Sequence, residues 1–585
     1  MRVSHDLSPA QARANQWKWK WRRRIAVAQG LYEAELVIRG GRVLNVFTEE
    51  LIEADVAIDA GVIAGIGNYP LARTEIVLHG EVIAPSFIDA HIHTEASLLW
   101  MPRFAEAVVP HGTGTIVTDP HEMANVAGIE GIRAMRDAAR TAPLNVFFTA
   151  PSCVPASRHE SPGADWPLAD IEDMLAWPET VGLGEMMNFP ALLAGEQDIA
   201  DILVAARGHR LDGHSPLLTG RALTAYIAAG IGSDHESVSL AEAEEKLRQG
   251  LMIMIREGSS EKNMHELLPL VSNATYPRIC FASDDRDCHD LAEVGHVDDI
   301  LRLAIAAGLD PVRAIRMATW NAAQYWQLPG IGAVAPGYDA NLVILSDLEQ
   351  VTVAKTLYRG QVVAEHGAMT STLEEAEIPH ELLHTVNVAP VRRSQMQVAA
   401  EDVTKAIQLV PGQIVTKLIQ IEPAAEGNVA ISDTSRDLLK TVSVERHRGT
   451  GRIGVAFTNG FGLSRGAIAS TVAHDAHNII AVGVSDEDIL AAIAIVAESQ
   501  GGLAVVAEGE VLGHIPLPIA GLMTNEPLSE VSTAYDALRK HVQGLGSTLA
   551  DPFGILAFLS LSVIPEARVT DRGLLDLTAH LETTT

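Results

Sequence analysis

Short apolar runs alternate with helix-like stretches through the middle of the chain. The helix-like stretches have apolar residues at helical spacing and include Glu130–Thr141, Leu240–Gly250 and Val297–Gly308. The apolar runs are Val82–His93, Gly114–Asp119, Asn145–Pro151, Thr180–Met186, Arg210–His214, Gly230–His235, Leu251–Glu257 and Arg278–Asp285. Such alternation over about 250 residues is typical of a (β/α)₈ barrel. An open doubly wound sheet shows the same alternation, but its usual Gly-x-Gly-x-x-Gly fingerprint follows none of these runs.

The segments on either side of this region have short apolar–polar alternations separated by glycines. This pattern predicts β-strands, and its return indicates one small β-sandwich formed by residues 31–84 and 333–370. The barrel is assigned to residues 85–332. We therefore expect an α/β protein in which a (β/α)₈ barrel is inserted into a small β-sandwich and is followed by a C-terminal α/β domain.

Three further segments complete the predicted organisation. Residues 1–30 are expected to form a helical extension, whose cluster Trp17-Lys-Trp-Lys-Trp-Arg-Arg-Arg24 lays aromatic side chains on its own domain. Residues 371–395 are polar and contain proline, as linkers do. In the C-terminal domain, residues 396–585, Ser485-Asp-Glu-Asp488 predicts the start of a helix. A second helix carries its apolar residues on one face, at Leu528, Val531, Tyr535, Leu538 and Val542.

Polar residues end several of the predicted barrel strands. The first strand ends in Asp89-Ala-His91-Ile-His93, where the alternation of side chains points both histidines the same way. The later strands end in Glu185, His214, His235 and Asp284. Because the C-terminal ends of barrel strands meet at one mouth, we expect these side chains to converge. A lone histidine is more often structural, but a series on five strand ends favours a metal site.

Imidazoles and carboxylates in this number suit borderline divalent metals and exceed what one catalytic zinc ion uses. We therefore expect a binuclear centre in which Glu185 and a water molecule bridge both ions. The expected metal ligands are His91, His93, Glu185, His214, His235 and Asp284.

Composition narrows the class of protein. The chain has 585 residues, with 43 lysines and arginines against 74 aspartates and glutamates, and its net charge is −31. Such a chain repels phosphate backbones, so no nucleic-acid partner is expected. No apolar run reaches the roughly 18 residues of a membrane span, so no membrane partner is expected. The 3 cysteines cannot form a disulfide framework and indicate a reducing, cytoplasmic location.

The motif Phe87-Ile-Asp-Ala-His-Ile-His93, with the later histidines and Asp284, resembles the amidohydrolase superfamily of metal-dependent barrel hydrolases. Longer stretches resemble the bacterial adenine deaminases within it, among them Thr118-Asp-Pro-His-Glu-Met-Ala-Asn125, Gly182-Leu-Gly-Glu-Met-Met-Asn188 and Val472-Ala-His-Asp-Ala-His-Asn478. The resemblance covers about residues 31–570. It implies hydrolysis of adenine to hypoxanthine and ammonia, as in purine salvage. It also implies a binuclear centre of Mn²⁺ or Fe²⁺, with Zn²⁺ as an alternative.

Under this interpretation a metal-bridged hydroxide attacks C6 of adenine, and Asp284 is expected to accept the proton of the water. A second acid must protonate the ring. Related deaminases use a glutamate three residues after the histidine of the fifth strand, but that position is Leu217 here. We instead expect Glu122 to donate the proton, with Asp119 or His121 orienting either Glu122 or the base. Pro120 predicts that this segment turns over the barrel mouth, although the two residues could also form only a loop ion pair.

The remaining expectations concern recognition and alternatives. Asp119, Arg256 and Asp285 are expected to contact the substrate, while a surface salt bridge remains an alternative for Arg256. His474 and His477 could form a lid, support the site or pack between domains. Apolar stretches in the last domain predict a homo-oligomer, a dimer. The alternative functions are hydrolysis of a cyclic amide or of an N6-substituted adenine, and a non-catalytic barrel scaffold.

Overall fold

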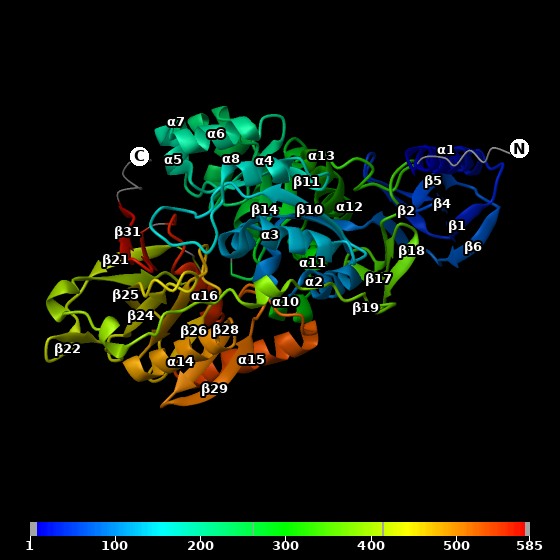
Figure 1. Ribbon diagram of the computed structural model, residues 1–585. Helices are drawn as coiled ribbons and strands as arrows, with labels where there is room; N and C mark the ends of the chain where they lie inside the picture. The colour runs from blue at the N-terminus through cyan, green and yellow to red at the C-terminus, as the bar shows by residue number, and fades with distance from the viewer. Residues whose placement is uncertain (1–8, 261, 412, 414, 565, 579–585) are drawn as a thin grey trace, which may run out of the picture.

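The structure is a computed structural model that describes residues 9–260, 262–411, 413, 415–564 and 566–578. The ends of the predicted first and last segments, residues 1–8 and 579–585, lie outside the described residues. A barrel occupies the middle of the molecule, with a β-sandwich on one side and a C-terminal sheet domain on the other (Figure 1). The predicted fold class is confirmed. The domain boundaries stay predictions.

Parallel strands build the barrel. They are β8 (Phe87–Ile92), β9 (Thr113–Thr118), β10 (Asn145–Ala150), β11 (Thr180–Met186), β12 (Arg210–Gly213), β13 (Ser233–Asp234), β14 (Met252–Arg256) and β15 (Ile279–Ala282). Strands β8 to β12 pair in one sheet and β13 to β15 in another. Backbone hydrogen bonds join the two sheets, because Gly232 N donates to Leu211 O at 2.9 Å and Asp284 N donates to His91 O at 3.0 Å. The ring of strands is therefore closed.

One of the predicted strands is two strands in the structure. The run Val82–His93 contains β7 (Val82–Pro85), which belongs to the sandwich, and β8, which begins the barrel. Pro85 lies at the junction, and because proline has no amide hydrogen to donate, strand pairing is readily interrupted there. The first barrel strand therefore follows directly from the sandwich.

A buried apolar cluster fills the barrel interior. Val117 of β9 and Met254 of β14 belong to this cluster although their strands are not neighbours, so the cluster extends across the barrel. Trp326 joins them and donates through Nε1 to Ala90 O at 2.8 Å. Helices cover the outside of the barrel or follow it: α2 (Met101–Val108), α3 (His121–Ala139), α4 (Leu168–Leu175), α5 (Phe189–Ala194), α6 (Gln197–Ala205), α7 (Gly220–Ala228), α8 (Leu240–Arg248), α9 (Met264–Leu267), α10 (Cys288–Glu293), α11 (Val297–Ala306), α12 (Pro311–Arg316) and α13 (Ala322–Trp326).

Two sheets with a shared apolar core form the sandwich. The smaller has the order β5 (Val62–Gly67), β4 (Asp55–Asp59), β1 (Ala34–Arg39), β6 (Ala72–Val77). The larger has the order β19 (Ala368–Met369), β18 (Gln361–Glu365), β17 (Thr352–Tyr358), β16 (Leu342–Asp347), β7, β2 (Arg42–Asn45), β3 (Glu50–Glu53). Strands from both sides of the barrel segment therefore pair in one sheet, as the sequence predicts.

The N-terminal helix α1 (Pro9–Ala28) packs on the smaller sheet, but its tryptophans do not. The prediction that the aromatic cluster covers its own domain is wrong, since Trp17, Trp19 and Trp21 are 66%, 60% and 48% exposed. Residues two apart on a helix point in different directions, so these three cannot share one buried face. The helix is held instead by Arg23, whose Nε lies 2.8 Å from Asp59 Oδ1 in a buried ion pair.

The C-terminal domain is built on one mixed sheet with three helices against it. The strand order is β21 (Thr416–Gln420), β20 (Lys405–Leu409), β25 (Ile453–Asn459), β24 (Leu438–Val444), β27 (Ile479–Gly483), β26 (Ala467–Ser470), β28 (Gly502–Ala507), β29 (Glu510–Pro516). Hairpins β22 (Ala424–Glu426)–β23 (Val429–Ile431) and β30 (Ala567–Thr570)–β31 (Gly573–Asp576) are separate. The helices are α14 (Asp486–Glu498), α15 (Leu528–Gly544) and α16 (Pro552–Phe558).

Both helices expected in this domain are present. Ser485 caps α14, and its side chain accepts a hydrogen bond from Asp488 N. Val531, Tyr535, Leu538 and Val542 of α15 are all buried, so the apolar face is the one that the spacing predicts. The segment 371–395, expected to be a linker, is mostly exposed or half-buried, but Leu382 is buried and its carbonyl accepts a hydrogen bond from Ala520 N at 2.7 Å. Within the described residues, no helix has the length and apolar character needed to span a lipid bilayer.

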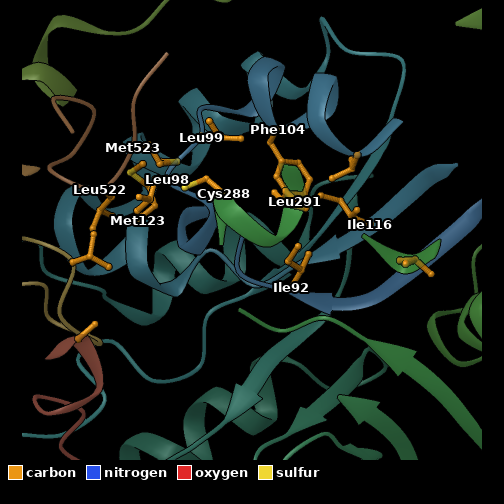
Figure 2. Close-up of a cluster of buried hydrophobic side chains, with 14 of the residues drawn as sticks. Ile92, Leu98, Leu99, Phe104, Ile116, Met123, Cys288, Leu291, Leu522 and Met523 are labelled. Carbon is orange, nitrogen blue, oxygen red and sulfur yellow. The ribbon is translucent and has the colours of Figure 1, made fainter. Parts of the chain in front are cut away.

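The C-terminal domain docks on the barrel beside the ends of the strands. Trp100 N donates to Thr524 O at 2.9 Å, and Thr524 N donates to Leu98 O at 2.8 Å, so the two segments pair like parallel strands. Figure 2 shows Leu522 and Met523 beside Leu98 and Met123 of the barrel, in one buried cluster. This contact places the C-terminal domain close to the predicted active-site mouth.

A second contact between the two domains generates a prediction about stability. Glu160, on the loop after β10, is buried and accepts hydrogen bonds from Ser157 N and from Ser562 Oγ of the C-terminal domain. Burial, aided by the nearby Asp475 carboxylate, raises the pKa of Glu160 to about 8. A protonated Glu160 therefore stabilises the folded protein below the unfolded pKa, and this contribution is lost as the pH rises through 8.

We expect the thermal midpoint of the wild type to fall more steeply between pH 5 and pH 8.5 than that of Glu160→Gln, which keeps the acceptor oxygen but cannot ionise. Scanning calorimetry at a series of pH values measures this difference, with the exposed Glu510→Gln as control. Parallel curves for Glu160→Gln and wild type would contradict the assignment.

Candidate metal centre and active-site mouth

His91 and His93 stand at the end of β8 with their Nδ1 atoms turned to fixed partners. His91 Nδ1 lies 2.8 Å from Asp212 Oδ2, and His93 Nδ1 lies 2.9 Å from the carbonyl oxygen of Asp119. Because a carbonyl only accepts, the Nδ1 atom of His93 carries its hydrogen. The two Nε2 atoms face each other at 3.1 Å. Both imidazoles thus present lone pairs to one point.

Glu185, at the end of β11, lies between two groups of histidines. Its Oε1 is 3.2 Å from His93 Nε2, and its Oε2 is 2.6 Å from His214 Nδ1 and 3.1 Å from His235 Nε2. The backbone of Glu185 is held by Asp119, whose Oδ2 accepts a hydrogen bond from Glu185 N at 2.9 Å. One carboxylate therefore faces both groups, which is the position that a bridging ligand requires.

Asp284 follows β15 and completes the group. Its Oδ1 lies 3.1 Å from His93 Nε2, and its Oδ2 lies 2.6 Å from Arg256 Nη1. Arg256 also pairs with Glu236 and is only 3% exposed, so the alternative of a surface salt bridge is wrong. Asp284 has a left-handed backbone with φ of 58°, which its hydrogen bonds to β8 hold in place. The structure thus brings together every predicted metal ligand.

The chemistry of these residues fits divalent cations. Ligand atoms of His91, His93 and Glu185 lie within 4.8 Å of one another, as do those of Glu185, His214 and His235. The two Nε2 atoms lie 3.1 Å apart with the carboxylates of Glu185 and Asp284 beside them, an arrangement that suits a bound cation. Burial alone would lower the pKa of His235, but Glu185 and the other carboxylates raise it to about 10. The field of the site therefore attracts positive charge.

His121 and Glu122 lie in the first turn of α3, on the other side of the same cavity. The prediction that they lie on a turn is wrong, because Pro120 occupies the N-cap of the helix with φ of −87° and ψ of 41°. Proline disfavours helix for the residue before it and is compatible with a helix that starts after it. His121 lies 3.6 Å from Glu185 Oε1 through Nδ1 and 3.5 Å from Asp475 Oδ1 through Nε2.

Glu122 forms an ion pair with a residue from the C-terminal domain. Its Oε1 lies 2.9 Å from His474 Nδ1, and its Oε2 lies 3.8 Å from His477 Nε2. Burial would raise the pKa of Glu122, but His474, with smaller contributions from His477 and His93, holds the pKa below its ordinary value. Burial would likewise lower the pKa of His474, but Glu122 raises it to about 9. In this pair the proton belongs to His474, which disagrees with the expectation that Glu122 is the acid.

The predicted substrate contacts differ in position. Arg256 and Asp285 line the cavity, together with His474, Asp475 and Phe558. Asp119 is not among the described residues that line it, because its carboxylate is buried against the backbone of Glu185. Asp119 thus supports Glu185 from behind the cavity wall, and its expected contact with substrate stays a prediction.

Among the charged side chains of the cavity wall, sequence reasoning assigned no role to Glu236 and Asp475, and it left the role of His474 open. Glu236 directly follows His235, so the strand-end pattern that identified His235 could have included it. The motif Val472-Ala-His-Asp-Ala-His-Asn478 was recognised, but its place in the site depends on how the last domain docks. Nothing in the pattern of that segment gives this docking.

The contact between Asp212 and His91 generates a prediction about metal affinity. A carboxylate on Nδ1 fixes the imidazole and makes its Nε2 a stronger ligand. We expect Asp212→Asn, which keeps the shape but removes the charge, to weaken binding of Mn²⁺ by roughly 10- to 100-fold. Competition against a chelator measures this affinity, with the exposed Asp198→Asn as the matched control. Unchanged affinity in Asp212→Asn would show that His91 does not depend on this contact.

Known proteins resemble this chain over nearly its whole length. The amidohydrolase family matches residues 82–363, and the adenine deaminase C-terminal domain matches residues 413–580. An adenine deaminase of Dehalococcoides mccartyi is 45% identical over 95% of this chain and 97% of its own length. Adenine deaminase 2 of Carboxydothermus hydrogenoformans is 42% identical over 94% of this chain and 97% of its own length. The adenine deaminase of Bacillus pumilus is 40% identical over 95% of this chain and 97% of its own length. The chain therefore belongs to the adenine deaminase family.

Proposed function

We infer that the protein hydrolyses adenine to hypoxanthine and ammonia. The observation that carries this inference is the identity of 40–46% with adenine deaminases across both the barrel and the C-terminal domain. The donor set at the barrel mouth supports it, because hydrolysis at an aromatic carbon needs a strong nucleophile. A non-catalytic scaffold would have no need to keep these ligands together.

Membership of the amidohydrolase family implies a divalent metal centre. We propose that it is binuclear, with His91, His93, Glu185, His214, His235 and Asp284 as ligands. Bound divalent cations lower the pKa of water towards neutrality and so supply a nucleophile at the pH of the cell. Mn²⁺ or Fe²⁺ as the metal, a homodimer and a cytoplasmic location stay predictions.

Asp284 is proposed as the base that accepts the proton of the attacking water. Its Oδ2 is held by Arg256, which turns Oδ1 towards His93 and the rest of the ligand group. Arg256 is thus proposed to position the base rather than to bind substrate. Asp285, next in sequence, remains a proposed substrate contact, because it faces the cavity and burial raises its pKa to about 7.

On the other side of the cavity, the observed contacts favour roles that differ from those expected from the sequence. Glu122 is proposed to hold His474 in place by charge, not to donate a proton. His121 is proposed to link Glu185 with Asp475, and Asp119 to fix Glu185 through its backbone amide. The barrel and the C-terminal domain thereby share one network of charged residues.

One observation favours adenine over amides that carry a carboxylate. Among the described residues that line the cavity, Arg256 is the only arginine, and Asp284 and Glu236 already engage it. A substrate carboxylate would therefore find no arginine to bind. Comparing ammonia release from adenine with amine release from N6-methyladenine distinguishes the remaining alternative.

The proposed function is tested with protein from manganese-supplemented cells from which iron is withheld. We expect ammonia release from adenine by the wild type and near-complete loss in Glu185→Gln and in Asp284→Asn, because each removes an anionic ligand. Surface Glu244→Gln is the matched control and should retain activity. Full activity in either site variant would remove that residue from the centre, and no ammonia release by metal-loaded wild type would reject the function.

A further inference from the structure

The segment between β26 and β27 carries His474 into the active-site cavity from the C-terminal domain. Its backbone is fixed by α16 and the residues after it, since His474 N donates to Ala557 O at 3.1 Å and Ser560 Oγ donates to His474 O at 2.9 Å. The imidazole stacks on Phe558, with centroids 4.5 Å apart and planes at 25°. His474 therefore has one defined position, although it belongs to a different domain from the metal ligands.

Carboxylates surround the imidazole. His474 Nδ1 lies 2.9 Å from Glu122 Oε1 and 4.0 Å from Asp475 Oδ1, while Nε2 lies 3.8 Å from Asp285 Oδ2. The ring of His477 lies 5.7 Å away, and its Nδ1 accepts a hydrogen bond from Ala473 N. The side chain of His474 is 8% exposed and lines the cavity with Asp284 and Asp285. Its Nδ1 is engaged by Glu122, whereas 3.8 Å is too long for a hydrogen bond from Nε2 to Asp285.

The other side chains of the cavity make this donor important. Among the described residues that line it, Glu122, Glu236, Asp284 and Asp285 offer acceptors, and the only arginine is engaged by two of them. The imidazole of His121 faces Glu185 and Asp475. A purine, however, presents acceptor nitrogens N1, N3 and N7 at its ring edge, and each loses water when it enters a buried cavity. An acceptor left without a donor there costs binding energy. The cavity therefore needs a donor for the ring. Although burial lowers the pKa of His474, the Glu122 carboxylate beside Nδ1 raises it to about 9, so the ring carries hydrogens on both nitrogens and Nε2 is in place to donate.

We propose that His474 donates a hydrogen bond through Nε2 to a ring nitrogen of the purine, so that the C-terminal domain completes the substrate site. This inference rests on the proposed function, because it needs adenine as the substrate. It makes His474 a substrate-contacting residue, and it makes Glu122 and Phe558 positioning residues that act through it.

Two variants distinguish the roles of the two ring nitrogens of His474. The amide of asparagine occupies the Nδ1 position, so His474→Asn can keep the contact with Glu122 but has no donor at Nε2. The amide of glutamine reaches the Nε2 position, so His474→Gln keeps a donor towards the cavity but loses the contact with Glu122. We expect His474→Asn to lower kcat/KM for adenine by roughly 10- to 100-fold and His474→Gln to recover part of this loss.

A purely structural role predicts the opposite order, with His474→Asn close to wild type and His474→Gln impaired, and that result would overturn the proposal. Metal content per chain and the thermal midpoint are measured for both variants. The exposed His541→Asn, in the same domain, serves as control.

Binding of 1-, 3- and 7-deazaadenine gives a second readout. Each analogue lacks one of the three ring nitrogens, so the wild type should bind the analogue that lacks the partner of His474 more weakly than adenine. The His474→Asn variant should bind that analogue and adenine with similar affinity. If His474→Asn does not fold, the same comparison in His474→Gln, with a smaller distinction expected, decides the question. An unchanged distinction for all the analogues would reject the contact. Wild type that fails to release ammonia from adenine would reject the proposed function instead, which separates the two failures.

Discussion

The site depends on the electrostatic cost of burying several imidazole and carboxylate groups close together. His91 and His93 direct lone pairs at each other across 3.1 Å, and the carboxylates of Glu185 and Asp284 face the same space. Such a group is unfavourable in a low-dielectric interior unless positive charge balances it. Closing the barrel between β8 and β15 forces this arrangement, since the same hydrogen bonds that complete the ring hold His91 and Asp284 side by side. Fold and metal affinity are thereby linked.

The balance of charge extends beyond the metal ligands. Arg256 neutralises Asp284 and Glu236 on one wall, and His474 neutralises Glu122 on the other. The buried Lys246 does the same behind β13, where its Nζ lies 2.8 Å from Asp234 Oδ2 and 2.7 Å from Glu242 Oε1. In a chain with a net charge of −31, each of these three buried cationic side chains lies between two carboxylates.

Local patterns predicted the parts of the site that depend on local geometry. Alternation along β8 was sufficient to place His91 and His93 on one side, and the ends of barrel strands were sufficient to bring Glu185 and Asp284 near them. The position of His474 could not be predicted this way, because it depends on docking between domains rather than on the pattern around it. The exposed tryptophans of α1 show a related limit, since composition did not reveal which face of the helix packs.

The pairing of Leu98 and Trp100 with Thr524 joins early and late parts of the chain. A ribosome releases the chain from its N-terminus, so all the proposed metal ligands, the last of them Asp284, emerge well before His474 and Thr524. The residues of the proposed metal site are therefore synthesised before the part of the cavity wall that the last domain adds. Enclosing this cavity thus requires the end of the chain, whereas the ligand set is complete once residue 284 has been made.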